Sequence, residues 1–414
     1  MCVRTPIGAT ASAQSELTQI GGETPQEIFE LMDIYIAGVA ETPLGKVSDH
    51  NELSMAAIAA REALAEAGMR FADVDALFTN YMPEVGGDCA SVRVGEYLGI
   101  YPKYSDATDL GGAAFESFVH HALVALREGR CECALIVYAS RQRSRRNRPR
   151  TTVENHYSIT GQFEQPYGLA SPISQYALQA ARHMYEYGVT REQLASVAVS
   201  ARAWAALNPK AWHRTPLTVA DVINSPLISD PLRQLDCCLV TDGGGAVVVT
   251  TASRARDAAK RAIKVIGVGE AQCAFHVAQI PDLAVTPGRQ SARTAFAMAG
   301  VTPRDVDLFE PYDNFTSAVI SQLEDVGFCE PGQGGAFVEA GHTLPGGSLP
   351  MSTMGGGLSY CHPGALGLLL LVESVRQLRW EAGERQVPGA GIAVAHGIGG
   401  PAFSTSATVV LARD

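Results

Sequence analysis

Four short segments combine polar side chains with glycine or proline, a composition typical of turns that carry reactive groups. Their two tyrosines, Tyr312 and Tyr360, and two histidines, His362 and His396, can give or take protons. An acid–base site therefore requires the chain to bring these turns together. The segments read DLGGAAFES (109–117), EPYDNFTS (310–317), GGLSYCHPGALG (356–367) and AHGIGGPAFS (395–404).

The third segment is the richest in chemistry. His362 precedes a strongly apolar stretch, where an imidazole either performs catalysis or caps a helix. Tyr360 and Tyr312 either contact substrate or pack in the core. Cys361 adjoins His362, but neighbouring side chains at a helix start point apart. A buried structural thiol is therefore favoured for Cys361 over a displaced nucleophile, and we place it in the lining of a substrate pocket.

The remaining polar positions supply supporting roles. Asp313 and Asn314 either orient their neighbours or cap the following helix, and we place both, with Ala114, in the lining of the substrate pocket. Gly399 and Gly400 suit close approach of the backbone to a ligand, so we expect them to contact the cofactor portion of a substrate. His396 begins the same turn and is expected to face the pocket.

Composition excludes several classes of protein. Thirty-two Lys and Arg against 43 Asp and Glu give a net charge of −11, which argues against a nucleic-acid binder. The longest apolar run, 366–372, has seven residues, far short of the ~20 that cross a bilayer. The first thirty residues lack the apolar region of a secretory signal. The nine cysteines form no C-x-x-C framework, so we expect a cytoplasmic protein without a metal site or bound cofactor.

The elements that would position these groups occur twice. AEAGMRFADVDALFTNY (65–81) and AMAGVTPRDVDLFEPYD (297–313) both predict a helix end, a turn and a strand. Segments 111–140 and 355–397 both predict a glycine-rich turn, an apolar helix and a strand. Helices apolar on nearly all faces must be buried. Two halves are therefore expected to pack about a pseudo-twofold axis, with the site where they meet.

The same pattern divides the chain. We predict an N-terminal arm over 1–32, a first half over 33–260 and a second half over 261–414. Within the first half, an insertion over about 141–235 holds two helices and is expected to cover the cavity. It begins with RQRSRRNRPR (141–150), six arginines in ten residues. These arginines either bind phosphates or the acidic face of a partner, or they belong to a solvated or dimer-facing loop.

Residues 33–414 resemble the thiolase superfamily, in particular the sterol-carrier-protein thiolases and thiolase-like lipid-transfer proteins. TDGGGAVVV, YDNF, GFCEPGQGGAFVEAG and GGLSYCHPGALG carry the resemblance. It implies an α/β fold, the duplicated five-layer αβαβα thiolase fold with an inserted loop domain. It also implies an acyl-CoA substrate, with coenzyme A bound as part of that substrate.

The family's catalytic groups are only partly kept. Ala114 stands where the resemblance implies the nucleophilic cysteine, and Tyr312 replaces a histidine. His362 matches a second histidine, and the last cysteine is absent, its place falling at His396 or Gly397. Because a cysteine nucleophile is missing, the chain resembles steroid side-chain aldolases, which implies paired Tyr312 and Tyr360 acting with His362 as catalytic residues.

Three hypotheses for function follow. The favoured one is retro-aldol cleavage of a β-hydroxyacyl-CoA. The second is a thiolytic (Claisen) acyl-CoA acyltransferase completed by a partner subunit, and the third is a non-catalytic acyl or lipid carrier. The resemblance further implies a homodimer and a small OB-fold/zinc-ribbon partner protein, without a membrane span.

Overall fold

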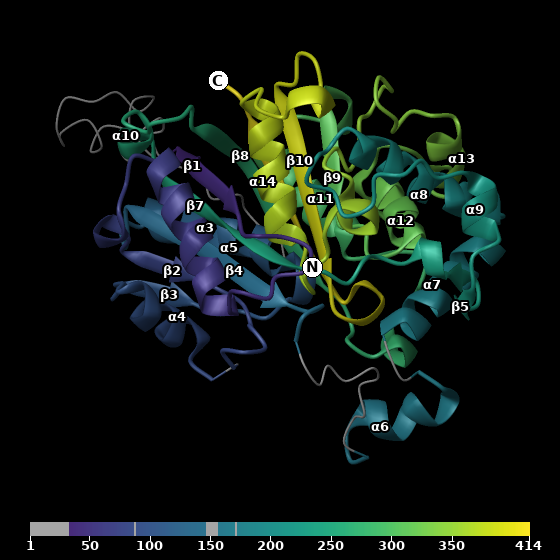
Figure 1. Cartoon of the computed structure of the whole chain (residues 1–414). Helices are drawn as coiled ribbons and strands as arrows, with labels where there is room; N and C mark the ends of the chain where they lie inside the picture. The colour runs from purple at the N-terminus through teal and green to yellow at the C-terminus, as the bar shows by residue number, and fades with distance from the viewer. Residues whose placement is uncertain (1–32, 87, 146–155, 170–171) are drawn as a thin grey trace, which may run out of the picture.

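A computed structural model of the chain describes residues 33–86, 88–145, 156–169 and 172–414. Its centre is a nine-stranded sheet in the order β3-β2-β4-β7-β1-β8-β11-β10-β9. Helices pack on this sheet, and the two halves of the chain lie side by side (Figure 1). The predicted N-terminal arm, 1–32, lies outside the described residues.

The first half supplies five strands and three helices to this core. Its strands are β1 (Ile34–Glu41), β2 (Ala76–Phe78), β3 (Tyr104–Asp106), β4 (Cys133–Arg141) and β7 (Asp242–Thr251). Its helices are α3 (Glu52–Glu66), α4 (Ala90–Leu98) and α5 (Ala114–Arg127). Asn51 caps α3, since its side chain accepts from the Ser54 backbone while the Ser54 side chain accepts from Asn51 N–H.

The second half repeats this order, except that no strand corresponding to β3 is present among its described residues. Its strands are β8 (Ile263–Gln272), β9 (Leu308–Pro311), β10 (Ile392–Gly399) and β11 (Thr405–Ala412). Its helices are α11 (Gly288–Ala299), α12 (Thr316–Val326), α13 (Gly334–Glu339) and α14 (Gly367–Leu378). In both halves a parallel strand pair, β2–β4 or β9–β10, continues into an antiparallel one, β4–β7 or β10–β11. The predicted duplication is therefore confirmed.

Two glycines show how closely the halves match. Gly68 and Gly300 end equivalent helices, and both have a φ of 68°, a left-handed conformation that glycine adopts without steric cost. A short 3-10 turn and a strand follow each of them. The halves join where β1 pairs with β8 through Tyr35 and Ile36.

The two apolar helices lie in the middle of the molecule. Helices α5 and α14 contact one another, and nearly every side chain of α14 is buried. The second glycine-rich turn differs from the expectation, since it does not lead directly into α14. Residues Gly356–Tyr360 form a π-helix, Cys361 is extended, and α14 begins only at Gly367. His362 therefore lies in a loop between two helices.

Between β4 and β7 the chain leaves the core. This segment contains α6 (Ile159–Phe163), α7 (Pro172–Tyr187), α8 (Arg191–Ala206), α9 (Val219–Ile223), β5 (Leu227–Ser229) and β6 (Leu232–Arg233), and α10 (Ala252–Ala255) follows β7. The two helices predicted here are thus present as α7 and α8. Helix α8 packs on the π-helix and α12, and α7 packs on the turn at 401–403. The segment therefore covers the ends of core elements.

Among the described residues, no helix is long and apolar enough to span a bilayer.

Candidate active site

Tyr312 and His362 form the centre of the site. The Tyr312 hydroxyl lies 3.1 Å from His362 Nε2, and the two rings are perpendicular. The Leu366 N–H, just before α14, donates to the same hydroxyl over 3.2 Å. Burial raises the pKa of Tyr312 well above its ordinary value. At neutral pH the phenol is therefore protonated and can relay a proton to or from the imidazole.

Three residues that the sequence did not single out individually hold this pair in place. Gln322 of α12 accepts from Tyr312 N–H and donates to Tyr312 C=O, at 3.0 and 2.8 Å. Thr241 accepts from His362 N–H through its side chain, and its own N–H donates to His362 C=O. Gly112 lies against the Tyr312 ring, where a Cβ would come within 2.2 Å of a ring carbon. The sequence signals were a polar Gln322 within a buried helix and the positions of Gly112 and Thr241 in the segments DLGGAAFES and TDGGGAVVV.

Asp313 links this pair to the π-helix. Its carboxylate accepts from Gly357 N–H at 2.5 Å and Leu358 N–H at 3.1 Å. Burial raises the pKa of Asp313 to about 7, against the lowering effect of these hydrogen bonds. Asp313 therefore orients the segment that carries Tyr360, one of the two roles expected of it. Asn314 is largely buried, and its side-chain oxygen has no hydrogen-bond partner among the described residues.

The second tyrosine has a different partner. The Tyr360 hydroxyl donates to Glu41 Oε1 at the end of β1, and no hydrogen bond joins it to Tyr312 or His362 within the described part of the chain. Burial, followed by the nearby Glu41 carboxylate, raises the pKa of Tyr360 well above its ordinary value. Each tyrosine thus has a proton-accepting group at its hydroxyl, His362 for one and Glu41 for the other.

Two cysteines lie close to these groups. Cys361 is fully buried and accepts a hydrogen bond from the Thr241 hydroxyl, and burial raises the pKa of its thiol to about 12. It is therefore not a thiolate at neutral pH. Cys238, which sequence reasoning did not single out, donates its N–H to Asn314 C=O and lies near enough to Tyr312 to affect its ionisation.

The start of α5 and the last turn meet beneath the pair. Ala114 is the first residue of α5 and is buried. Gly399 packs so closely on this turn that a Cβ would lie 1.9 Å from Leu110 O, and a Cβ on Gly111 would lie 2.9 Å from Gly400 N. Gly400 C=O accepts from the Tyr176 hydroxyl of α7. The two glycines therefore allow close packing of two backbone turns beside the site.

His396 is directed elsewhere. Its two ring nitrogens lie 2.8 Å from Thr408 Oγ1 and 3.1 Å from Ser406 Oγ, and Gly288 of α11 packs on the ring. Burial lowers the pKa of His396 to about 3, so the ring is neutral. Only its backbone C=O, which accepts from Tyr312 N–H, joins the site.

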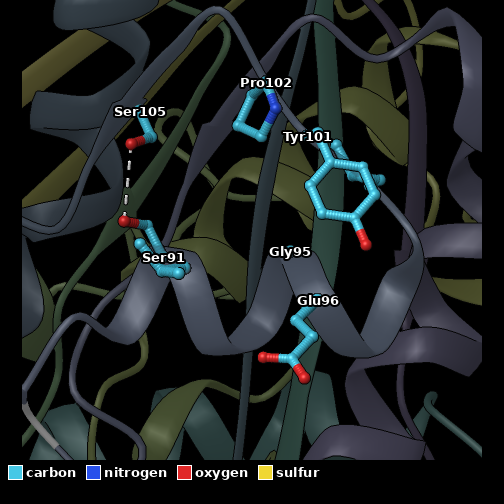
Figure 2. A pocket seen from close by; sticks show the side chains of 8 residues that line it. Ser91, Gly95, Glu96, Tyr101, Pro102 and Ser105 are labelled. Carbon is cyan, nitrogen blue, oxygen red and sulfur yellow. Dashed lines mark hydrogen bonds between the residues drawn. The ribbon is translucent and has the colours of Figure 1, made fainter.

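A surface pocket beside α4 does not belong to this arrangement. The described residues contain no group of three or more His, Cys, Asp or Glu placed to hold a metal ion. The pocket, of about 420 Å³, lies between α4 and β3, with Tyr101 and Ser105 on its wall (Figure 2). None of the predicted site residues lines it.

Comparison with known proteins gives a consistent result. A family model described as "Thiolase C-terminal domain-like" matches residues 269–413. An acetyl-CoA acetyltransferase of Methanothermobacter thermautotrophicus is 34% identical over 92% of this chain and 100% of its own length. A 17-hydroxy-3-oxo-4-pregnene-20-carboxyl-CoA lyase of Mycobacterium tuberculosis is 35% identical over 83% of this chain and 91% of its own length.

A solved structure of an "Ltp2-ChsH2(DUF35) aldolase" superposes with a TM-score of 0.83 at 30% identity, covering 93% of this chain and 99% of the other. Two duplicated α/β halves, with acid–base groups beside the starts of the buried central helices, define a thiolase-fold enzyme. The chain belongs to the thiolase family, in the branch of thiolase-like lipid-transfer proteins. The predicted fold is thereby confirmed.

Proposed function

We propose that the chain cleaves a carbon–carbon bond in a β-hydroxyacyl-CoA thioester by a retro-aldol reaction. One observation carries this proposal: Ala114 begins α5, where the family resemblance implies a nucleophile, while a phenol–imidazole pair is assembled beside it. Retro-aldol cleavage needs acids and bases but no covalent acyl-enzyme. The lyase and the acetyltransferase among the relatives both have CoA thioesters in their names, which supports the substrate class.

The two tyrosines divide the proton transfers. The Tyr360 oxygen accepts the proton of the β-hydroxyl as its own phenolic proton passes to the carboxylate that its hydroxyl contacts. The Cα–Cβ bond breaks, and the electron pair of that bond passes to the thioester as an enolate. Tyr312 then delivers a proton to Cα and recovers one from His362. The products are a carbonyl compound and a shortened acyl-CoA, and no net proton is consumed. Tyr312 also accepts from Leu366 N–H at the start of α14, so the partial positive charge there stabilises the phenolate formed during transfer.

The direct test is product analysis. The full chain, with and without a DUF35-type partner, is incubated with a 17-hydroxy steroid 20-carboxyl-CoA and with a short-chain β-hydroxyacyl-CoA. We expect a ketone and an acyl-CoA to form without added free coenzyme A. Thiolysis of a β-ketoacyl-CoA that depends on free coenzyme A, with no cleavage of either hydroxyacyl substrate, contradicts the proposal.

The acetyltransferase relative favours a second candidate, thiolytic Claisen chemistry. That reaction needs a thiolate, and Cys238 is the cysteine whose charge would be felt at Tyr312. Cys238→Ala distinguishes the two candidates, because retro-aldol cleavage survives the substitution and a thiolysis dependent on Cys238 does not. A trapped acyl adduct on Cys238, detected by peptide mass spectrometry, supports the Claisen candidate.

The assembly is also a proposal. The name of the aldolase neighbour includes a DUF35 component, which supports a small OB-fold partner for this chain. We further propose a homodimer that pairs along β3, the edge strand of the sheet, beside which Val92 of α4 and Tyr101 of the loop before β3 are exposed. Tyr101→Glu is then expected to yield monomers in light scattering. The expected location is cytoplasmic, in keeping with the cysteines of the described residues, which form no disulfide.

A further inference from the structure

Three side chains from distant parts of the chain connect the buried Tyr360 with the surface. The Tyr360 hydroxyl donates to Glu41 Oε1, and Lys210 Nζ donates to Glu41 Oε2 at 2.5 Å. Tyr360 is 1% exposed, the Glu41 side chain is 16% exposed and the Lys210 side chain is 65% exposed. The series therefore runs from the core to solvent in two contacts.

The order of groups in this series suits a proton acceptor at its centre. A phenol that shares its proton with a carboxylate can accept a second proton on its oxygen while it releases the first. The Lys210 ammonium forms a charge-assisted hydrogen bond with the other oxygen of the Glu41 carboxylate. Since both Tyr360 and Glu41 have their partners already in place, no side chain has to turn during the transfer.

We propose that Glu41 accepts the Tyr360 proton as Tyr360 accepts the β-hydroxyl proton, and that the exposed Lys210 ammonium connects Glu41 with solvent. Glu41 is in this role a positioning residue, because it acts through Tyr360. The inference rests on the proposed function and deepens it. The balance is complete: the hydroxyl proton moves to the Tyr360 oxygen, the phenolic proton moves to Glu41 Oε1, and solvent removes it from there.

The other charged groups around the series do not offer the same route. The charge of Glu373 affects Tyr360 electrostatically, but the Glu373 carboxylate is paired with Arg385 and accepts a hydrogen bond from the Thr353 hydroxyl. The Arg385 guanidinium likewise interacts electrostatically with both Tyr360 and Glu41. Cys361 adjoins Tyr360 with a thiol whose pKa is raised to about 12 by burial. Glu41 is thus the acceptor in hydrogen-bond contact with the Tyr360 hydroxyl.

The test compares Glu41→Gln with the wild type and with Glu132→Gln, which removes a surface ion-paired carboxylate near Arg254. In Glu41→Gln we expect kcat to fall about 100-fold with KM unchanged, since general-base help is typically worth ~10²–10⁴ in rate. The solvent deuterium isotope effect on kcat should rise, because proton transfer becomes rate-limiting. Glu41→Asp should recover part of the loss, and Lys210→Met should lower kcat less than Glu41→Gln.

A second measurement does not depend on turnover. In protein labelled with [¹³Cζ]tyrosine, the Tyr360 resonance is assigned by its loss in Tyr360→Phe. We expect it to shift in Glu41→Gln and to stay in place in Glu132→Gln. If the wild type is active and Glu41→Gln leaves kcat, its pH profile and the isotope effect unchanged, the relay is overturned while the proposed function stands. If the wild type cleaves neither hydroxyacyl substrate, the proposed function fails, and an unmoved Tyr360 resonance then overturns the relay separately.

Discussion

The Tyr312 hydroxyl lies 3.1 Å from His362 Nε2 and also accepts a hydrogen bond from Leu366 N–H. The hydroxyl therefore faces an imidazole that can exchange protons and a helix start that stabilises negative charge. Fifty residues separate the tyrosine from the histidine in sequence. They meet because the end of β9, which Tyr312 follows, lies beside the loop before α14, which contains His362.

If these two residues act as a unit, their substitutions should not be additive. Tyr312→Phe is expected to lower kcat by about 10²–10⁴, with little change in thermal stability because the ring remains on Gly112. His362→Gln should cost a similar factor. The double variant should then be scarcely worse than either single variant, a coupling measured by a double-mutant cycle. Fully multiplicative losses would show that the two residues act independently.

Cys361 provides a test of the missing thiolate. Because its thiol is buried and its pKa is raised to about 12, native protein should resist iodoacetamide at this position. The exposed Cys89 and Cys273 should react first. Cys361→Ala should leave cleavage nearly unchanged and cost roughly 1 kcal/mol of stability through the lost sulfur atom. Rapid alkylation of Cys361 with loss of activity contradicts this expectation.

The fold and the central pair could be predicted from the sequence because their signals are local or repeated. The Asp-Val-Asp turns of the two copies predicted equivalent elements, and the structure has them at β2 and β9. Tyr312 and His362 were singled out from their turns, although their contact depends on how β9 and the loop before α14 converge.

The rest of the site depends on tertiary packing that leaves no local pattern. Glu41 lies 319 residues from Tyr360 and reads as an ordinary polar strand end. The π-helix follows from left-handed Gly355 and Gly356, which glycine composition alone does not specify. His396 looked like a site residue from its glycine-rich turn. Alternation along β10 instead directs its ring toward α11, where Gly288 packs on it.

A close backbone approach leads to a third prediction. A Cβ at Gly112 would lie 2.2 Å from a Tyr312 ring carbon and 2.5 Å from Ile398 O. Gly112→Ala should therefore displace the tyrosine, lowering both kcat and the melting temperature. Gly391→Ala is the matched control, since the nearest atom to its Cβ is Asp307 Oδ2 at 3.6 Å. Equal activity in both variants would mean that the Tyr312 position is not critical.

Glu116 leads to a prediction for the pH dependence of stability. It lies in the first turn of α5, fully buried, and neither carboxyl oxygen has a hydrogen-bond partner among the described residues. Its carboxyl instead lies against Gly367 and Gly397, 2.4 and 2.3 Å from where their Cβ atoms would stand. Burial raises the pKa of Glu116 to about 8. The folded state therefore holds a proton that the unfolded state releases at much lower pH.

The sign of the effect follows from proton binding. Between the ordinary carboxyl pKa of about 4.3 and the folded value of about 8, the folded state binds more protons, so stability falls as pH rises. Below this window both states are protonated, and above it both are ionised, so the contribution stops changing. Glu116→Gln removes this slope, which is at most about 1.4 kcal/mol per pH unit. Denaturant melts of wild type and Glu116→Gln at pH 5, 6.5 and 8 measure the difference.

The comparison isolates Glu116 from other buried acids. Asp313, whose pKa burial raises to about 7, contributes a slope of the same sign, but it is present in both proteins and cancels in the difference. Glu62→Gln, an exposed substitution on α3, controls for loss of one negative charge. We expect the stability of Glu116→Gln relative to wild type to increase steadily from pH 5 to pH 8. The difference in stability between Glu62→Gln and wild type should stay constant over the same range. A constant offset between Glu116→Gln and wild type would mean that Glu116 ionises normally and is hydrated in solution.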